Sequence, residues 1–273
     1  MNKKWYGALF VLFSAGLTAS VLLRTCLILY AVDPKTGFYV EGSTLVSSLN
    51  ILLIVFTAIL LIPFLMKDRQ KSSLPAHSSA LSTVSFLLAV SMLLDAVLQL
   101  GQVIFSRGGA GVFVSGITEA IASITFFSLG GQYLSGKKTL HWAVSLLPVV
   151  WSAFHLITTF MHYTTIANIS EYLFDIVRLV FVLLFLYCHA RLTGNVKNYK
   201  QVNGLFACGL PAALYSGLST LPHYFAYFSG TNKGSLPTAN DAVYLILSIY
   251  ILILLASLVF GKTAKPQPTE KAE

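Results

Sequence analysis

The chain of 273 residues is 56% hydrophobic and only 10% charged, whereas soluble domains carry a charge on about a quarter of their residues. This composition excludes an ordinary soluble domain and predicts an integral membrane protein. The net charge of +8 would favour a nucleic-acid partner in a soluble protein, but these basic residues fall in short loops between apolar segments. We therefore expect the lipid bilayer, and no nucleic acid, as the partner of the basic residues.

Eight apolar segments are long enough to span a bilayer as helices, which takes about 20 residues each. In chain order they are predicted at 5–32, 44–66, 80–105, 113–134, 142–163, 171–189, 202–228 and 242–260. The predicted fold is an all-α bundle of about eight transmembrane helices, with residues 1–261 forming one membrane domain and 262–273 a disordered cytoplasmic tail. An alternative keeps seven helices, because the small residues Ala19 and Ser20 also suit cleavage of a signal peptide.

Basic residues predict the orientation of these helices. Thirteen of the eighteen Lys and Arg residues form five patches, and two spans separate each patch from the next. The patches are Lys3 and Lys4; Lys67, Arg69 and Lys71; Lys137 and Lys138; Arg191, Lys197 and Lys200; and Lys262, Lys265 and Lys271. The connections on the opposite side hold only Lys35, Arg107 and Lys233. By the positive-inside rule both chain ends are cytoplasmic, in a multi-pass protein of the cell (plasma or cytoplasmic) membrane.

Five charged residues lie within the predicted spans, where facing lipid would cost each of them at least about 2.5 kcal/mol. They are Arg24, Asp95, Glu119, Asp175 and Arg178. At ~1.5 Å rise per residue, all five fall roughly 3 to 10 Å to the outer side of the midplane. His155 falls in the same layer, and His223 lies slightly further out. A shared layer predicts one site in the interior of the bundle.

Helical spacing supports this site, because residues at i, i+3, i+4 and i+7 share one face. Four consecutive spans carry such polar stripes: Ser91, Asp95, Gln99 and Gln102; Ser115, Glu119 and Ser123; Ser152, His155, Thr159 and His162; and Glu171, Asp175 and Arg178. The i, i+3 spacing of Asp175 and Arg178 allows an ion pair within one helix.

The last two spans differ from the others. The seventh contains Gly204, Gly209, Gly217, Pro211 and Pro222, and we expect proline to kink it, as in helices that line transporter sites or in simple packing kinks. The eighth is almost uniformly apolar, and we expect it to face lipid. Aromatic residues near the predicted interfaces, Tyr133 and Tyr244 among them, are expected to form a membrane-surface belt.

No sequence motif indicates an enzyme, a metal site or a cofactor. The segment from Gly131 to Lys138 resembles a phosphate-binding loop, but Lys138 stands where that motif needs Ser or Thr. The three cysteines have no metal-binding or disulfide spacing and are expected to be small core residues. We therefore expect a protein that is not an enzyme and uses neither a metal nor a cofactor.

Two interpretations of the intramembrane charges remain open. Two arginines face three carboxylates, so one carboxyl group can hold a proton, which a proton-coupled carrier needs. Alternatively, the charges form a static network that fixes helix packing. The sequence favours a carrier of a small polar or charged solute, an ion or a proton, with a polar cavity among helices one and three to seven. Its candidate binding residues are Arg24, Asp95, Gln99, Glu119, His155, Asp175, Arg178 and His223. A membrane sensor or receptor, or an accessory subunit with unknown protein partners, is the alternative.

Overall fold

The computed structural model describes residues 3–31, 44–66, 77–106, 109–136, 140–163, 170–194, 201–230 and 237–260. These ranges are helical and contain no strand. The long helices are α1 (Lys3–Tyr30), α2 (Thr44–Leu60), α3 (Ser79–Ser106), α4 (Ala110–Ser135), α6 (Leu147–Tyr163), α7 (Ser170–Thr193), α8 (Gln201–Phe228) and α9 (Ala239–Phe260). Eight segments are long and apolar enough to cross a membrane, which confirms the predicted all-α class and the predicted number of helices of this length. The tail predicted to be disordered, 262–273, lies outside the described residues.

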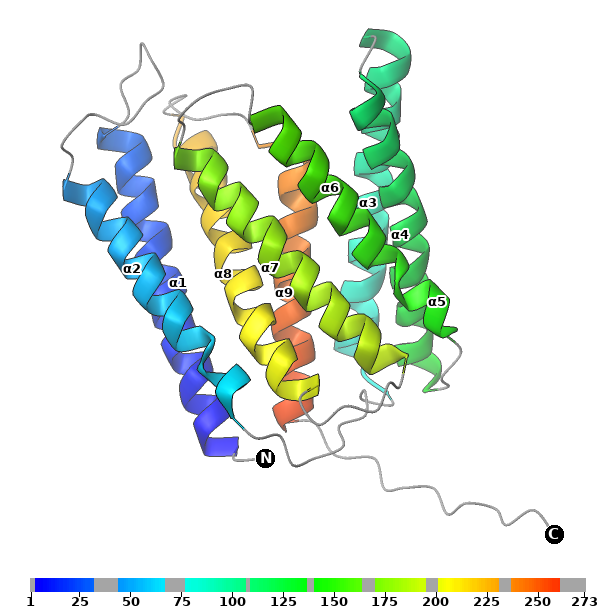
Figure 1. The fold of residues 1–273 in the computed structure, drawn as a ribbon, viewed down its shortest axis with the longest axis horizontal. Coiled ribbons are helices and arrows are strands. Elements are labelled where there is room, and N and C mark those ends of the chain that lie inside the picture. The colour runs from blue at the N-terminus through cyan, green and yellow to red at the C-terminus, as the bar shows by residue number, and fades with distance from the viewer. Residues whose placement is uncertain are drawn as a thin grey trace.

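The long helices run side by side and alternate in direction (Figure 1). We call the end where α1 begins and α9 ends the base, and the opposite end the distal end. The connections from α3 to α4, α6 to α7 and α8 to α9 join helix ends at the distal end (Figure 1). The described helix ends that flank the five basic patches all lie at the base.

Helix α8 occupies the middle of the bundle and is almost entirely buried. It packs between α1 on one side and α7 and α9 on the other. Its glycines make this possible: a Cβ at Gly209 would lie 3.0 Å from Phe185 and 3.1 Å from Ile251. Likewise, a Cβ at Gly217 would lie 2.9 Å from Leu17 of α1. Small residues therefore bring α8 close to its neighbours, as is common where membrane helices meet.

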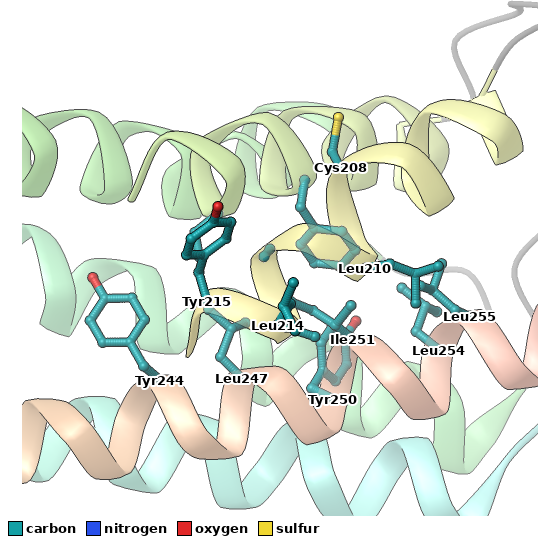
Figure 2. Packing of buried hydrophobic residues seen from close by; sticks show 14 of the residues in the cluster. Cys208, Leu210, Leu214, Tyr215, Tyr244, Leu247, Tyr250, Ile251, Leu254 and Leu255 are labelled. Atoms are coloured by element: carbon teal, nitrogen blue, oxygen red, sulfur yellow. The ribbon is translucent and has the colours of Figure 1, made fainter. Parts of the chain in front are cut away.

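The prediction that the last span faces lipid is wrong. One side of α9 is buried over its whole length, and Figure 2 shows this side packed against α8. Tyr244 and Tyr250 are completely buried, and Tyr133 of α4 is 1% exposed. Tyr133 and Tyr244 are therefore core residues and do not belong to a membrane-surface belt. A uniformly apolar helix suits either the core or the lipid, so its composition could not distinguish the two.

Two predicted single helices are interrupted near a proline. The second span ends as α2 at Leu60, and a short 3-10 helix, η1 (Ile62–Leu65), follows around Pro63. The fifth span consists of α5 (Trp142–Ser145) and α6, with Pro148 at the start of α6. Proline lacks an N–H and cannot donate to the carbonyl four residues earlier, which for Pro148 is that of Val144. The hydroxyl of Thr125 on α4 donates to this carbonyl instead, at 2.9 Å.

Candidate functional site

The polar stripes of α3 and α4 meet in the distal half of the bundle. The side-chain amide nitrogen of Gln99 donates to Oδ2 of Asp95 at 2.8 Å and to Oε2 of Glu119 at 2.9 Å. The first bond joins residues one turn apart on α3, and the second joins α3 to α4. Gly116 allows this approach, because a Cβ there would lie 3.1 Å from Leu100 of α3. One amide therefore links two carboxyl groups on neighbouring helices.

The two carboxyl groups of this pair are buried and close together. Asp95 is 5% exposed and Glu119 is fully buried. Both accept a hydrogen bond from the same amide nitrogen of Gln99, which brings the two groups close together. Among the described residues, neither forms a salt bridge with a basic group. Oε1 of Glu119 is buried and accepts no hydrogen bond in the described part of the chain.

Helix α6 contributes Trp151 and His155 to the same layer. Nδ1 of His155 lies 3.3 Å from the hydroxyl of Ser115, which is one turn from Glu119 on α4. The indole of Trp151 is 1% exposed and lies near enough to Glu119 to act on its carboxyl group. It also stacks on the ring of Tyr244 from α9, with ring centroids 6.2 Å apart.

Helix α7 supplies the positive charge of this layer. A guanidinium nitrogen of Arg178 lies 3.3 Å from a carboxylate oxygen of Asp175, which confirms the predicted i, i+3 pair. The guanidinium carbon also lies 4.1 Å from the ring centroid of Tyr244, a favourable arrangement of a cation over an aromatic face. Arg178 is therefore held by Asp175 and Tyr244, while the Asp95–Glu119 pair is held by Gln99.

We name this group the distal polar cluster. It comprises Asp95, Gln99, Ser115, Glu119, Trp151, His155, Asp175, Arg178 and Tyr244. Counted along their helices at ~1.5 Å per residue, its charged members lie between about 7 and 17 Å from the distal helix ends. Two members of the predicted stripes, His162 and Glu171, have side chains outside the described part of the structure.

Arg24 belongs to a different part of the bundle. It is 1% exposed, and its guanidinium donates to the carbonyl oxygen of Leu218 on α8 at 3.1 Å. Pro222, four residues further along α8, has no N–H to offer this carbonyl. Arg24 also lies over the ring of Phe174 from α7, 5.2 Å from its centroid. These contacts place Arg24 where α1, α7 and α8 meet.

His223 also lies on α8, in a half-buried position near the distal end. The contacts that define the distal polar cluster come from α3, α4, α6, α7 and α9. The predicted cavity included α1 and α8 and left out α9; which helices line a cavity stays a prediction.

Sequence analysis missed Trp151 and Tyr244 as members of the cluster. A signal for Tyr244 was present, because Asp241, Tyr244 and Ser248 repeat at i, i+3 and i+7 on one face of α9. The acidic Asp241 acts electrostatically on Asp95 from this helix. Trp151 is next to Ser152, a member of the predicted stripe. Neighbouring residues lie on the same turn of a helix but on different faces, so the stripe did not predict Trp151.

A second buried polar group lies closer to the base. The hydroxyl of Tyr250 on α9 lies 2.9 Å from Nε2 of His189 on α7 and 3.3 Å from the hydroxyl of Tyr133 on α4. All three side chains are at most 3% exposed. The ring of Phe126 on α4 packs edge-on against Tyr250, with centroids 5.5 Å apart. This group contains no carboxylate. Its members are neutral hydroxyl and imidazole groups that are hydrogen-bonded to one another.

The distal polar cluster presents two buried carboxyl groups side by side. Its acid pair offers carboxylate oxygens from two helices, which are ligands for hard cations as well as proton acceptors. Within the described ranges, no group of three or more His, Cys, Asp or Glu residues could hold a metal ion. Comparisons with models of protein families, with curated proteins and with solved structures found no match for this chain.

Proposed function

We propose that this protein is a carrier of a small solute or ion, coupled to protons that bind at the Asp95–Glu119 pair. The observation that supports this proposal best is the partner of the two carboxyl groups. Both are buried, both are bonded to the single amide of Gln99, and neither has a salt bridge among the described residues. A pair of this kind changes its charge when it gains or loses one proton.

Burial makes a negative charge on this pair unfavourable. An isolated charge in a low-dielectric interior costs several kcal/mol, roughly, even after the surroundings relax. Two ionised carboxylates that share one amide also repel each other. A proton on one of them removes the repulsion and lets that carboxyl group donate to the other. The protonated pair is therefore stable in the closed bundle, whereas the doubly ionised pair needs water or a cation.

The positive charge of Arg178 does not compensate the acid pair directly. It is 3.3 Å from Asp175 and lies over Tyr244, so its charge is balanced within α7. We infer that a proton or a cation from outside the protein binds at Asp95 and Glu119 and compensates their negative charge. Ionisable residues inside a membrane bundle are functional candidates by default, and proton relays are one of their common uses.

We further propose that the base faces the cytoplasm and the distal end faces the outside, in the cell (plasma or cytoplasmic) membrane. The five basic patches support this orientation through the positive-inside rule. In this orientation the acid pair is closer to the outer surface than to the cytoplasm. The proton would then enter from the outside, together with the transported solute or in exchange for it.

Trp151 provides a direct test of proton binding, because its indole lies beside Glu119. The chain has only three tryptophans, so Trp5→Phe and Trp142→Phe together leave Trp151 as the single reporter. We expect its fluorescence to change with pH and Glu119→Gln to remove this change. His155 also lies near Trp151, with ring centroids 6.0 Å apart, so His155→Asn serves as a control that should leave the change in place. Loss of the change in His155→Asn, with its retention in Glu119→Gln, would contradict the proposal.

Transport is tested in liposomes that contain only this protein and an internal pH-sensitive dye. A pH gradient is imposed, and sodium, potassium, lithium and a panel of small organic solutes are added in turn. We expect one of them to move protons in the wild type and in the control Thr118→Val, whose hydroxyl bonds only to carbonyls of its own helix, but not in Asp95→Asn. Ligand binding without flux would favour the sensor or receptor function instead. Neither binding nor flux, together with co-purification of a partner, would favour an accessory subunit.

A further inference from the structure

Two cysteine thiols meet between α7 and α8, in the half of the bundle closer to the base. A Cβ at Gly204 of α8 would lie 3.3 Å from Sγ of Cys188, so this thiol on α7 lies directly against α8. Cys208 is one turn beyond Gly204 and therefore on the same face of α8. Figure 2 shows its side chain directed away from α9. The thiol of Cys188 therefore lies against the face of α8 that carries Cys208.

We propose that Cys188 and Cys208 form a dithiol that an oxidant converts into a disulfide bond joining α7 to α8. Both cysteines are free thiols in this structure. In the reaction the two S–H bonds break, one S–S bond forms, and two protons and two electrons leave the pair. A disulfide oxidant such as oxidised glutathione accepts them through thiol–disulfide exchange and is released as two thiols.

The surroundings of the pair differ from those of an inert core cysteine. Cys188 is half-buried and lies five residues before the end of α7, so it is close to the end of the helix. Arg191, less than one turn away, places a positive charge near its thiol. Cys26, by contrast, is exposed on α1 and provides an internal control for non-specific oxidation.

The disulfide would fix two helices with different roles. Helix α7 carries Asp175 and Arg178 of the distal polar cluster, and α8 is the buried centre of the bundle. In the orientation proposed above, the pair lies in the cytoplasmic half, where thiols are normally kept reduced. The bond would then form only when oxidants rise. This consequence rests on the proposed orientation, whereas formation of the bond itself does not.

Counting free thiols in the full-length protein tests the proposal. The protein in its native membrane is treated with copper(II) phenanthroline, in which two copper(II) ions take up the two electrons. It is then unfolded in SDS and labelled with a heavy polyethylene-glycol maleimide, which adds one gel shift per free thiol. We expect three shifts before oxidation, one after oxidation, and three again after treatment with a reductant.

Conservative variants identify the cysteines that react. Cys26→Ser should go from two shifts to none, whereas Cys188→Ser and Cys208→Ser should each keep two shifts. Three shifts in the oxidised wild type would overturn the proposal. So would a loss of shifts in Cys188→Ser that matches the loss in the wild type. None of these readouts depends on transport, so failure of the proposed carrier function would leave the result unchanged.

Discussion

The α1–α8 contact and the distal polar cluster both bury charged side chains, but these have different kinds of partner. At the α1–α8 contact, Arg24 donates to the backbone carbonyl of Leu218, which Pro222 leaves without its usual helical donor. In the cluster, Asp95 and Glu119 are bonded to one side-chain amide. Burial is similar in the two regions, but the type of partner differs. Arginine stays protonated, so we assign Arg24 to the architecture, whereas on our proposal the acid pair changes its protonation.

The architectural use of polar groups occurs twice in this protein. Pro148 withdraws a donor from the carbonyl of Val144, and the Thr125 hydroxyl supplies one from α4. In a membrane, freed backbone groups need such partners because the lipid offers none. A proline in one helix and a polar side chain in its neighbour therefore form a unit. Mutations in such units should therefore lower stability, whereas a mutation in the acid pair should mainly affect function.

The largest effect is expected for Arg24→Ala. This change removes a large buried side chain and leaves the Leu218 carbonyl without the guanidinium donor. We expect a loss of about 3–5 kcal/mol in the free energy of unfolding, from the cavity and the unsatisfied acceptor together. The measurement is unfolding of the purified protein in mild detergent, followed by heat or denaturant.

The link between Arg24 and Pro222 is tested by a double-mutant cycle. Pro222→Ala restores an N–H for the Leu218 carbonyl, so it should stabilise Arg24→Ala more than it stabilises the wild type. We expect a difference of about 1 kcal/mol, the worth of one buried hydrogen bond. Equal effects in the two backgrounds would show that the bond to Leu218 is not what makes Arg24 important.

Tyr250→Phe is expected to have the next largest effect. It leaves Nε2 of His189 and the hydroxyl of Tyr133 without their buried partner, at a cost of about 1–3 kcal/mol in the free energy of unfolding. Tyr227→Phe, at an exposed position on α8, is a matched control that should change stability by less than about 0.5 kcal/mol. Equal stability of the two variants would contradict a structural role for the His189–Tyr250–Tyr133 group.

A smaller loss, about 1 kcal/mol in the free energy of unfolding, is expected for Thr125→Val. This change keeps the shape of the side chain and removes only the donor to the Val144 carbonyl. Thr118→Val is the matched control, because the Thr118 hydroxyl bonds only to carbonyls of its own helix. A loss in Thr118→Val as large as that in Thr125→Val would mean that the bond across α4 and α5 has no special role.

The local part of the site could be predicted from sequence, and the part between helices could not. Residue spacing alone placed Asp95 and Gln99 on one face of a helix and predicted the pair of Asp175 with Arg178, and both pairs are in contact. The bond from Gln99 to Glu119 depends on how α3 packs against α4, which spacing does not determine.

The same limit explains the errors in the prediction. Arg24 lies in the predicted layer, but depth alone could not assign it to Leu218 instead of the acid pair. The apolar side of α9 faces the core and not the lipid, and lipid is as apolar as a protein core. The only sequence signal for the role of Tyr244 was therefore the short polar repeat of Asp241, Tyr244 and Ser248.

The smallest effect on stability, and the largest on function, is expected for Glu119→Gln. The amide keeps the size of the side chain and removes one of two mutually repelling acids, so unfolding should change by less than about 1 kcal/mol or become harder. Asp175→Asn is the comparison for stability, because it breaks the pair with Arg178 and should make unfolding easier. If Glu119→Gln instead unfolds as easily as Arg24→Ala, the carboxylate is part of a static network. The acid pair would then resemble the α1–α8 contact, and the distinction by type of partner would fail.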